Sequence, residues 1–259
     1  VDVNLLMHSR TIATVLGCRF VSGYLHRREN LTRQLTTASG IEPQGRTGGN
    51  QGFNQIIPWV LGPFFGETPQ TYFCHHMGMH HPENNLPDDL SSTMKFQRDR
   101  FGHWLRYYAR FMSFTIIDLP RYFFRRGQAK MASRVLVGEL GFWAVVAALM
   151  IFVDWRATLV VFVIPVVMVR TLMMMGNWGQ HAFLKQEGET ENTLGTTLLD
   201  TAHNRRCFNN GYHALHHHRQ AMHWSELPDE YTRREAAYND EGSIVFRGVP
   251  TFQAVSFAL

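Results

Sequence analysis

Two apolar runs separated by only three residues set the strongest constraint on this chain of 259 residues. The first run covers residues 135–153 and the second covers residues 157–175, so each contains 19 residues. A helix of that length is about 28 Å long, close to the thickness of the hydrocarbon layer of a bilayer. Asp154, Trp155 and Arg156 are expected to form the short turn between the runs. We therefore predict a transmembrane helical hairpin, with a buried hairpin in a soluble core as the alternative.

Basic residues flank the outer ends of this hairpin and predict its orientation. They are Arg121, Arg125, Arg126, Lys130 and Arg134 before the first run, and Lys185 after the second. Because lysine and arginine are enriched in cytoplasmic loops, both outer ends are expected on the cytoplasmic side. A hairpin returns the chain to the side it left, so the segments before and after it are expected on one face of the membrane.

Two further segments are typical of the membrane interface. Residues 101–126 mix aromatic and basic side chains, which favours an interfacial helix. Residues 53–66 are apolar but too short to span, and Pro58 and Pro63 interrupt them, which favours an interfacial or re-entrant piece. The net charge of +4 suits an anionic membrane surface, and the sequence contains no nucleic-acid-binding motif. The predicted fold is an all-α integral membrane protein with the hairpin, interfacial helices and a cytoplasmic helical cap.

Histidine is concentrated in two short segments of the predicted cap. Of the 14 histidines, eight lie within residues 75–81 and 213–218, and His223 follows the second segment closely. Imidazole is the commonest side-chain ligand for borderline transition metals, so this clustering indicates a metal site. Surface histidines without a metal are the alternative. A structural zinc site commonly uses cysteine pairs, and no CxxC pair is present.

Helical spacing brings several of these histidines to one face. His76 and His80 stand one turn apart, as do His213 and His217, with His216 beside the second pair. His81 lies about 100° around the helix from His80, so it is expected to turn toward a second metal. An all-histidine site with room for two metals fits this arrangement better than a single closed site.

The HxxxHH and HxxHH boxes around an apolar hairpin resemble the membrane fatty-acid desaturase and hydroxylase superfamily. The resemblance extends over residues 56–228 and is most specific in CHHMGMHHPENN, GNWGQHAF and FNNGYHALHHH. These runs are similar to a subgroup of acyl-lipid desaturase-like proteins. The resemblance implies that histidine boxes and one isolated histidine hold two irons, and that no catalytic residue is needed beyond the metal ligands.

The resemblance also implies the individual ligands. The second box falls on His76, His80 and His81, and the third on His213, His216 and His217. The run from Asn177 to His181 resembles a pattern in which the histidine binds iron and the asparagine contacts it through water. His181 also follows the cytoplasmic end of the second apolar run. Glu83, Asp88, Asp89 and Asp200 are candidate acceptors for the N–H groups of the ligands, with solvated loop acids as the alternative.

The implied reaction is oxidative. Two irons would use O2 and external electrons to desaturate a fatty acyl chain, carried either on a lipid or on acyl-CoA. Because the sequence contains no dinucleotide-binding fingerprint or haem motif, the electrons are expected from a partner such as cytochrome b5 or a ferredoxin. The first alternative is hydroxylation of a lipid or alkane by the same kind of site. The second alternative is a non-catalytic membrane protein that binds metal.

One feature of the superfamily is absent from the sequence. An HxxxH box is expected before the second box, but no histidine lies between His26 and His75. We therefore expect three regions, namely an atypical segment at 1–54, a desaturase-like domain at 55–230 and a C-terminal tail at 231–259. The first region is interpreted as truncated, mis-spliced or characteristic of an inactive relative. One of the two irons would then lack ligands.

Overall fold

The computed structural model describes residues 57–184, 193, 195–201, 204, 208–220, 222–249 and 253–254. The expected N-terminal segment 1–54, the basic residue Lys185 and His203 lie outside the described residues. The described part is mostly helical, as predicted. It also contains a pair of parallel three-residue strands that the all-α prediction did not include, β1 (Thr197–Leu199) and β2 (Val245–Arg247).

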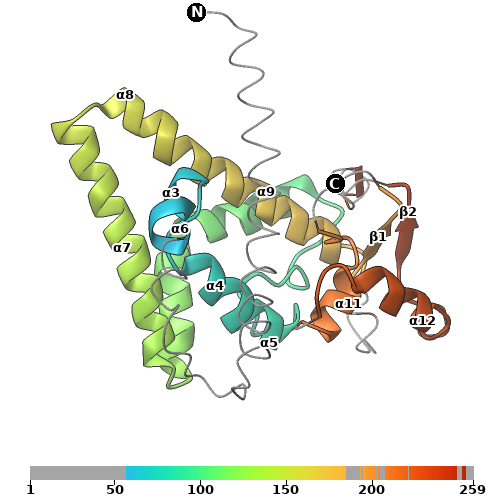
Figure 1. Ribbon diagram of the computed structural model, residues 1–259. Coiled ribbons are helices and arrows are strands. Elements are labelled where there is room, and N and C mark those ends of the chain that lie inside the picture. Colours follow the sequence, from blue (N-terminus) through green and yellow to red (C-terminus); the bar gives the residue numbers. More distant parts are fainter. Residues whose placement is uncertain are drawn as a thin grey trace, which may run out of the picture.

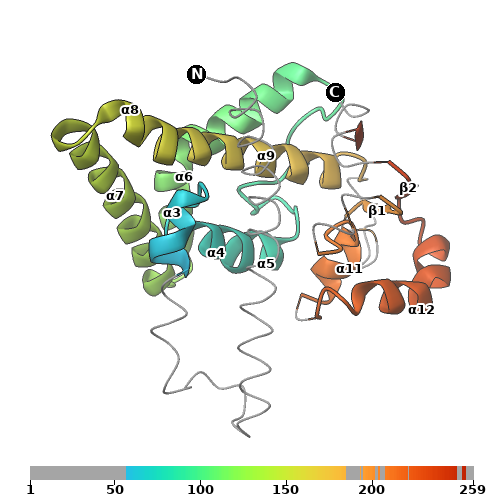
Figure 2. The same ribbon diagram turned by 45° about the horizontal axis from the view of Figure 1, so that its top comes forward.

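The two apolar runs form long helices that diverge from a tight turn (Figures 1 and 2). The first helix is α7 (Ala129–Phe152), and the second consists of α8 (Trp155–Thr158), the π-helical turn η3 (Leu159–Val163) and α9 (Ile164–His181). By length and composition, Ala129–Phe152 and Trp155–His181 can each cross a membrane. They pack together near the turn, where Phe142 and Val146 of α7 contact Val166 of α9.

The helices are longer than the apolar runs from which they were predicted. The first begins at Ala129 because Ala, Lys, Met and Arg before the apolar run are all good helix formers. The second continues to His181 because Met174 and Trp178 pack against another helix. The predicted three-residue turn was wrong in extent, since Trp155 and Arg156 belong to α8. Asp154 begins that helix, and its carboxylate accepts a hydrogen bond from the Ala157 backbone N–H at 2.8 Å.

Helix α6 (Phe101–Arg125) lies at the end of the hairpin away from the turn, where α7 begins and α9 ends. Its last turns, with Leu119 and Phe123, pack against Val135 of α7. Its first turns, with Trp104 and Tyr107, pack against α9. The helix predicted from the aromatic and basic residues therefore lies across the ends of both apolar helices, while its interfacial position stays a prediction.

A segment before α6 fills the opening between α7 and α9 (Figure 1). It consists of η1 (Ile57–Leu61), α3 (Gly62–Phe64), α4 (Thr71–His75), the π-helical turn η2 (His76–His80) and α5 (His81–Glu83). Only Gly fits at position 138 of α7, because an added Cβ would lie 1.8 Å from the Pro69 carbonyl oxygen. A buried ion pair between Glu139 and Arg170 joins α7 to α9, and Thr68 hydrogen-bonds both side chains.

The remaining elements lie beside the end of α9 (Figure 1). They are α11 (His213–His218), α12 (Leu227–Asp240) and the strand pair, in which Thr197 pairs with Val245. Leu215, Leu227, Tyr231 and Tyr238 form their core. The domain boundary expected at residue 230 falls inside α12, so the described part of the expected tail packs with this unit.

Candidate metal centre

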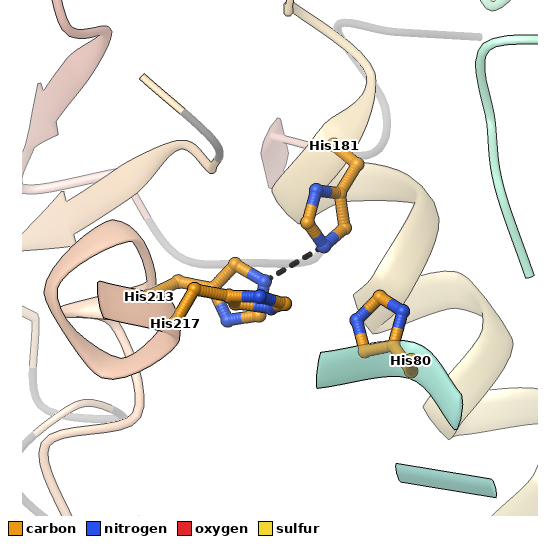
Figure 3. Close-up of side chains that lie close together, drawn as sticks. All are labelled: His80, His181, His213 and His217. Carbon is orange, nitrogen blue, oxygen red and sulfur yellow. Dashed lines mark hydrogen bonds between the residues drawn. The ribbon is translucent and has the colours of Figure 1, made fainter. Parts of the chain in front are cut away.

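The structure brings all seven histidines that were expected to bind metal into two adjoining groups. In each group the ring nitrogens that face one another lie within 4.8 Å. The first group, called the four-histidine group, contains His80, His181, His213 and His217 (Figure 3). The second, called the three-histidine group, contains His76, His81 and His216.

The way that the second box is divided between the groups differs from the prediction. We expected His76 and His80 on one helix face and His81 turned toward a second metal, but His76 and His80 belong to different groups and His76 is grouped with His81. The reason is the π-helical turn η2, in which the backbone N–H of His81 bonds to the carbonyl of His76. Such a wider turn brings residues five apart much closer to one face than an α-helix does, and His76 faces His81. Helix α11 shows the expected α-helical spacing of His213 and His217, which share a group, but His216, expected beside this pair, belongs to the three-histidine group.

The four-histidine group is buried. His181, at the end of α9, and His213, at the start of α11, place their Nε2 atoms 2.9 Å apart (Figure 3). The rings of His80 and His217 lie edge to face, with centroids 4.9 Å apart. This group therefore joins residues from three segments that are far apart in the sequence.

The three-histidine group is more open. His81 is buried, whereas His76 and His216 are half-buried. The Nε2 atoms of His76 and His81 are 3.0 Å apart, and the rings of His81 and His216 have centroids 4.7 Å apart. The two groups touch through His81 and His217, whose rings stack with centroids 4.6 Å apart.

Burial keeps three of these rings in the form that binds metal. Desolvation, followed by repulsion from neighbouring histidines, lowers the pKa of His81, His213 and His217 well below the usual value. A ring that stays neutral at pH 7 retains a nitrogen lone pair for a metal ion. His81, His213 and His217 therefore offer donor atoms suited to a transition metal.

Hydrogen bonds to the opposite ring nitrogen orient two ligands of the four-histidine group. His80 Nδ1 lies 2.6 Å from the buried carboxylate of Asp89, and His217 Nδ1 lies 2.7 Å from the side-chain oxygen of Asn84. Both oxygens accept, so each Nδ1 carries the proton. Within the described residues, the Nε2 atoms of His80 and His217 are buried and have no hydrogen-bond partner. Each is left with a lone pair to offer a metal.

The geometry fits metal ions of the size expected. Metal–imidazole bonds of about 2.1 Å place neighbouring ligand nitrogens about 3.0–3.4 Å apart. The two measured Nε2–Nε2 distances, 2.9 and 3.0 Å, are close to this spacing. Four imidazoles can satisfy one metal in the four-histidine group, while three leave positions open in the other group.

Other histidines in the two boxes do not join either group. His75 is buried and stacks on His80 with ring centroids 6.3 Å apart, and burial lowers its pKa to about 4. Arg234 contacts the Nε2 atom of His218 at 3.3 Å. His223 bonds to Ser225.

Asn177 lies one helical turn before His181, as the sequence pattern predicts. Its amide donates hydrogen bonds to the Ser91 carbonyl at 3.0 Å and to the Tyr107 hydroxyl at 2.7 Å. It therefore ties α9 to the segment that contains Asp89. An indirect contact from Asn177 to a metal stays a prediction.

The acidic residues that were considered as acceptors behave differently from one another. Asp89 alone among the four bonds to a histidine of the two groups. Glu83 and Asp88 pair with Arg126, and Asp200 pairs with Arg247. Sequence reasoning missed Asn84, because an asparagine gives no sign of a partner 133 residues away in the chain.

Comparison with known proteins identifies a family for most of the chain. The family model described as fatty acid desaturase matches residues 44–247, a stretch that includes both histidine boxes and His181. Comparisons with curated proteins and with solved structures gave no significant match.

Proposed function

This chain belongs to the fatty acid desaturase family, and from that premise we propose that it is a membrane di-iron oxidoreductase acting on fatty acyl chains. The observation that supports the proposal most is the convergence of seven histidines into two touching groups. Family membership favours iron among the metals that imidazole suits. Two irons held there would supply the reduction of O2 and the removal of hydrogen from an unactivated C–H bond.

The proposed reaction is desaturation of an acyl chain. Two hydrogens leave adjacent carbons, a double bond forms, and O2 is reduced to two waters with two electrons and two protons from outside. Since the sequence contains no nucleotide or haem motif, we propose that cytochrome b5 or a ferredoxin delivers the electrons. The acyl carrier is a lipid or coenzyme A.

The position of the histidines beside the apolar helices supports a substrate that comes from the bilayer. His181 ends the second apolar helix, and the outer sides of both helices expose large apolar residues such as Val137, Leu140, Val160 and Ile164. A bilayer would cover these side chains, with both histidine groups at its cytoplasmic face. The buried rings of the four-histidine group would keep water away from the reacting chain.

The three-histidine group supports a second, non-catalytic candidate. The group contains only three histidines, the sequence has no HxxxH pair between His26 and His75, and two of the three rings are half-buried. A metal held by three imidazoles with exposed edges is bound more weakly than one held by four buried imidazoles. We therefore expect little or no desaturation by this chain alone, and a membrane metal-binding protein without activity is the alternative.

A fusion tests the proposed reaction. A hydrophobic hairpin ending in HxxxH, placed before residue 57, should allow the protein to bind two irons and produce mono-unsaturated lipids in a membrane host. Fatty-acid analysis is the measurement, and the same fusion with His217→Ala should give none. The matched control is His218→Ala, which changes the neighbouring histidine outside both groups.

Three outcomes would contradict this account. Hydroxylated acyl chains would assign the fusion to the sister reaction. A fusion that binds two irons and leaves the lipids unchanged would favour the non-catalytic alternative. Full desaturation by the unmodified chain would show that another histidine, such as His75 or His203, completes the site.

A further inference from the structure

The segment from Asn84 to Thr93, called the 84–93 loop, is polar in sequence, and yet five of its ten residues are buried. Its buried polar residues, each at most 1% exposed, are Asn85, Asp89, Ser91, Ser92 and Thr93. Burial of so many polar groups costs free energy unless they are hydrogen-bonded. Where these bonds lead therefore indicates what the loop does.

Bonds within the loop give it a fixed shape. The Asp89 carboxylate accepts from the backbone N–H groups of Asn85 at 3.0 Å and Ser91 at 2.7 Å, and from the Ser91 hydroxyl at 2.7 Å. The side-chain oxygen of Asn85 accepts from the Thr93 backbone N–H at 2.8 Å, and the backbone carbonyl of Asn85 accepts from the Ser92 hydroxyl at 2.6 Å. The loop is therefore internally braced.

Among the bonds that leave the loop, three reach three different histidines of the four-histidine group. Asp89 accepts from His80 at 2.6 Å, and Asn84 accepts from His217 at 2.7 Å. The Thr93 hydroxyl donates to the backbone carbonyl of His181 at 3.1 Å. One short loop thus contacts three ligands that come from η2, α9 and α11.

We propose that the 84–93 loop assembles the four-histidine group, with Asp89 and Asn84 as positioning residues for His80 and His217. This inference rests on the proposed function, because it assumes that the group binds metal. Each oxygen holds the proton on Nδ1 and fixes the plane of the ring, so that Nε2 faces the other ligands. Carboxylate and amide oxygens that hold metal-binding histidines in this way typically change metal affinity about 10- to 100-fold when removed.

The chemistry at Asp89 distinguishes it from an ordinary loop acid. Its two oxygens accept four hydrogen bonds, from His80, from the Ser91 hydroxyl and from the backbone N–H groups of Asn85 and Ser91. An amide at this position would place its own N–H2 against at least one of these donors. Asp89→Asn should therefore disturb His80 although it preserves the size of the side chain.

Asn84 allows a test that separates its side chain from its backbone. It has a φ of 48°, in the left-handed region where Gly, Asn and Asp are favoured. Asn84→Gly keeps this backbone conformation and removes the acceptor for His217. Asn84→Asp keeps both the backbone conformation and an accepting oxygen.

The experiment is an anaerobic titration of the purified 259-residue chain with Fe(II), against a competing chelator. Asp89→Asn and Asn84→Gly should each weaken the tighter iron about 10-fold or more, whereas Asn84→Asp should bind it as the unmodified chain does. The matched control is Asp88→Asn, the same change at the neighbouring exposed carboxylate, which pairs with Arg126. Thermal unfolding of each metal-free protein shows whether the variants fold.

Two results would overturn the proposal, and they have different meanings. Unchanged iron affinity in both Asp89→Asn and Asn84→Gly would reject the role of the loop while leaving the proposed function intact. Failure of the unmodified chain to bind iron would reject the proposed function and the role of the loop with it. If Asp89→Asn does not fold, the comparison of Asn84→Gly with Asn84→Asp decides the question.

Discussion

At the scale of single residues, Glu67 has an ionisation state set by its position next to the Glu139–Arg170 pair. Burial raises the pKa of Glu67 to about 8. The nearby positive charge of Arg170 lowers this pKa, and the negative charge of Glu139 raises it. The unfolded chain loses this proton near the ordinary value of 4.5, whereas the folded protein keeps it until about pH 8. The free energy of unfolding therefore falls as the pH rises through this window.

Glu67→Gln tests this assignment, because glutamine resembles the protonated acid and does not titrate. The variant should be about as stable as the unmodified protein near pH 4.5 and more stable at pH 8, with an advantage that grows by about 1.4 kcal/mol for each pH unit in between. Thermal unfolding in detergent between pH 4.5 and 8.5 measures the difference. Glu226→Gln, which changes an exposed glutamate, should show no such trend. A difference that does not grow with pH would contradict the assignment.

At the scale of elements, the contact between α7 and the segment before α4 depends on one glycine. A Cβ at Gly138 would lie 1.8 Å from the Pro69 carbonyl oxygen, whereas a Cβ at Gly141 on the same helix would meet nothing within 4 Å. Gly138→Ala should therefore destabilise the protein by about 1–3 kcal/mol through overpacking. Gly141→Ala should be neutral or stabilise it by up to about 1 kcal/mol. Thermal unfolding compares them, and equal effects would show that this contact does not form.

The orientation of the hairpin is a second prediction at this scale. Asp154 lies at the turn and Ser133 lies near the start of α7, so the two are expected on opposite sides of a membrane. Single cysteines at these positions, with the three native cysteines replaced, should react with an impermeant reagent from opposite faces. The position 133 cysteine should react from the cytoplasm. Reaction of both from one face would support the alternative of a buried soluble hairpin.

At the scale of the whole molecule, the sequence predicted the main helices and the family, and the family model confirms the family. A long apolar run predicts a long helix because such a run is recognised from local composition alone. How His76, His80 and His81 are divided between the two groups could not be predicted, because a π-helical turn has no distinct residue pattern. Two further features could not be predicted, namely the contact from Asn84 to His217 and the short strand pair. Both depend on packing between distant segments.

The central claim is that the seven histidines form one complete metal position and one incomplete position. The measurement that tests it most directly is the amount of iron bound per chain as Fe(II) is titrated into the unmodified protein. We predict a first iron bound tightly and a second bound weakly, so that the chain retains fewer than two after dialysis. His217→Ala should remove the tight iron, His216→Ala should remove only the weak one, and His218→Ala should change neither. No bound iron in the unmodified chain, or equal losses in all three variants, would contradict the account.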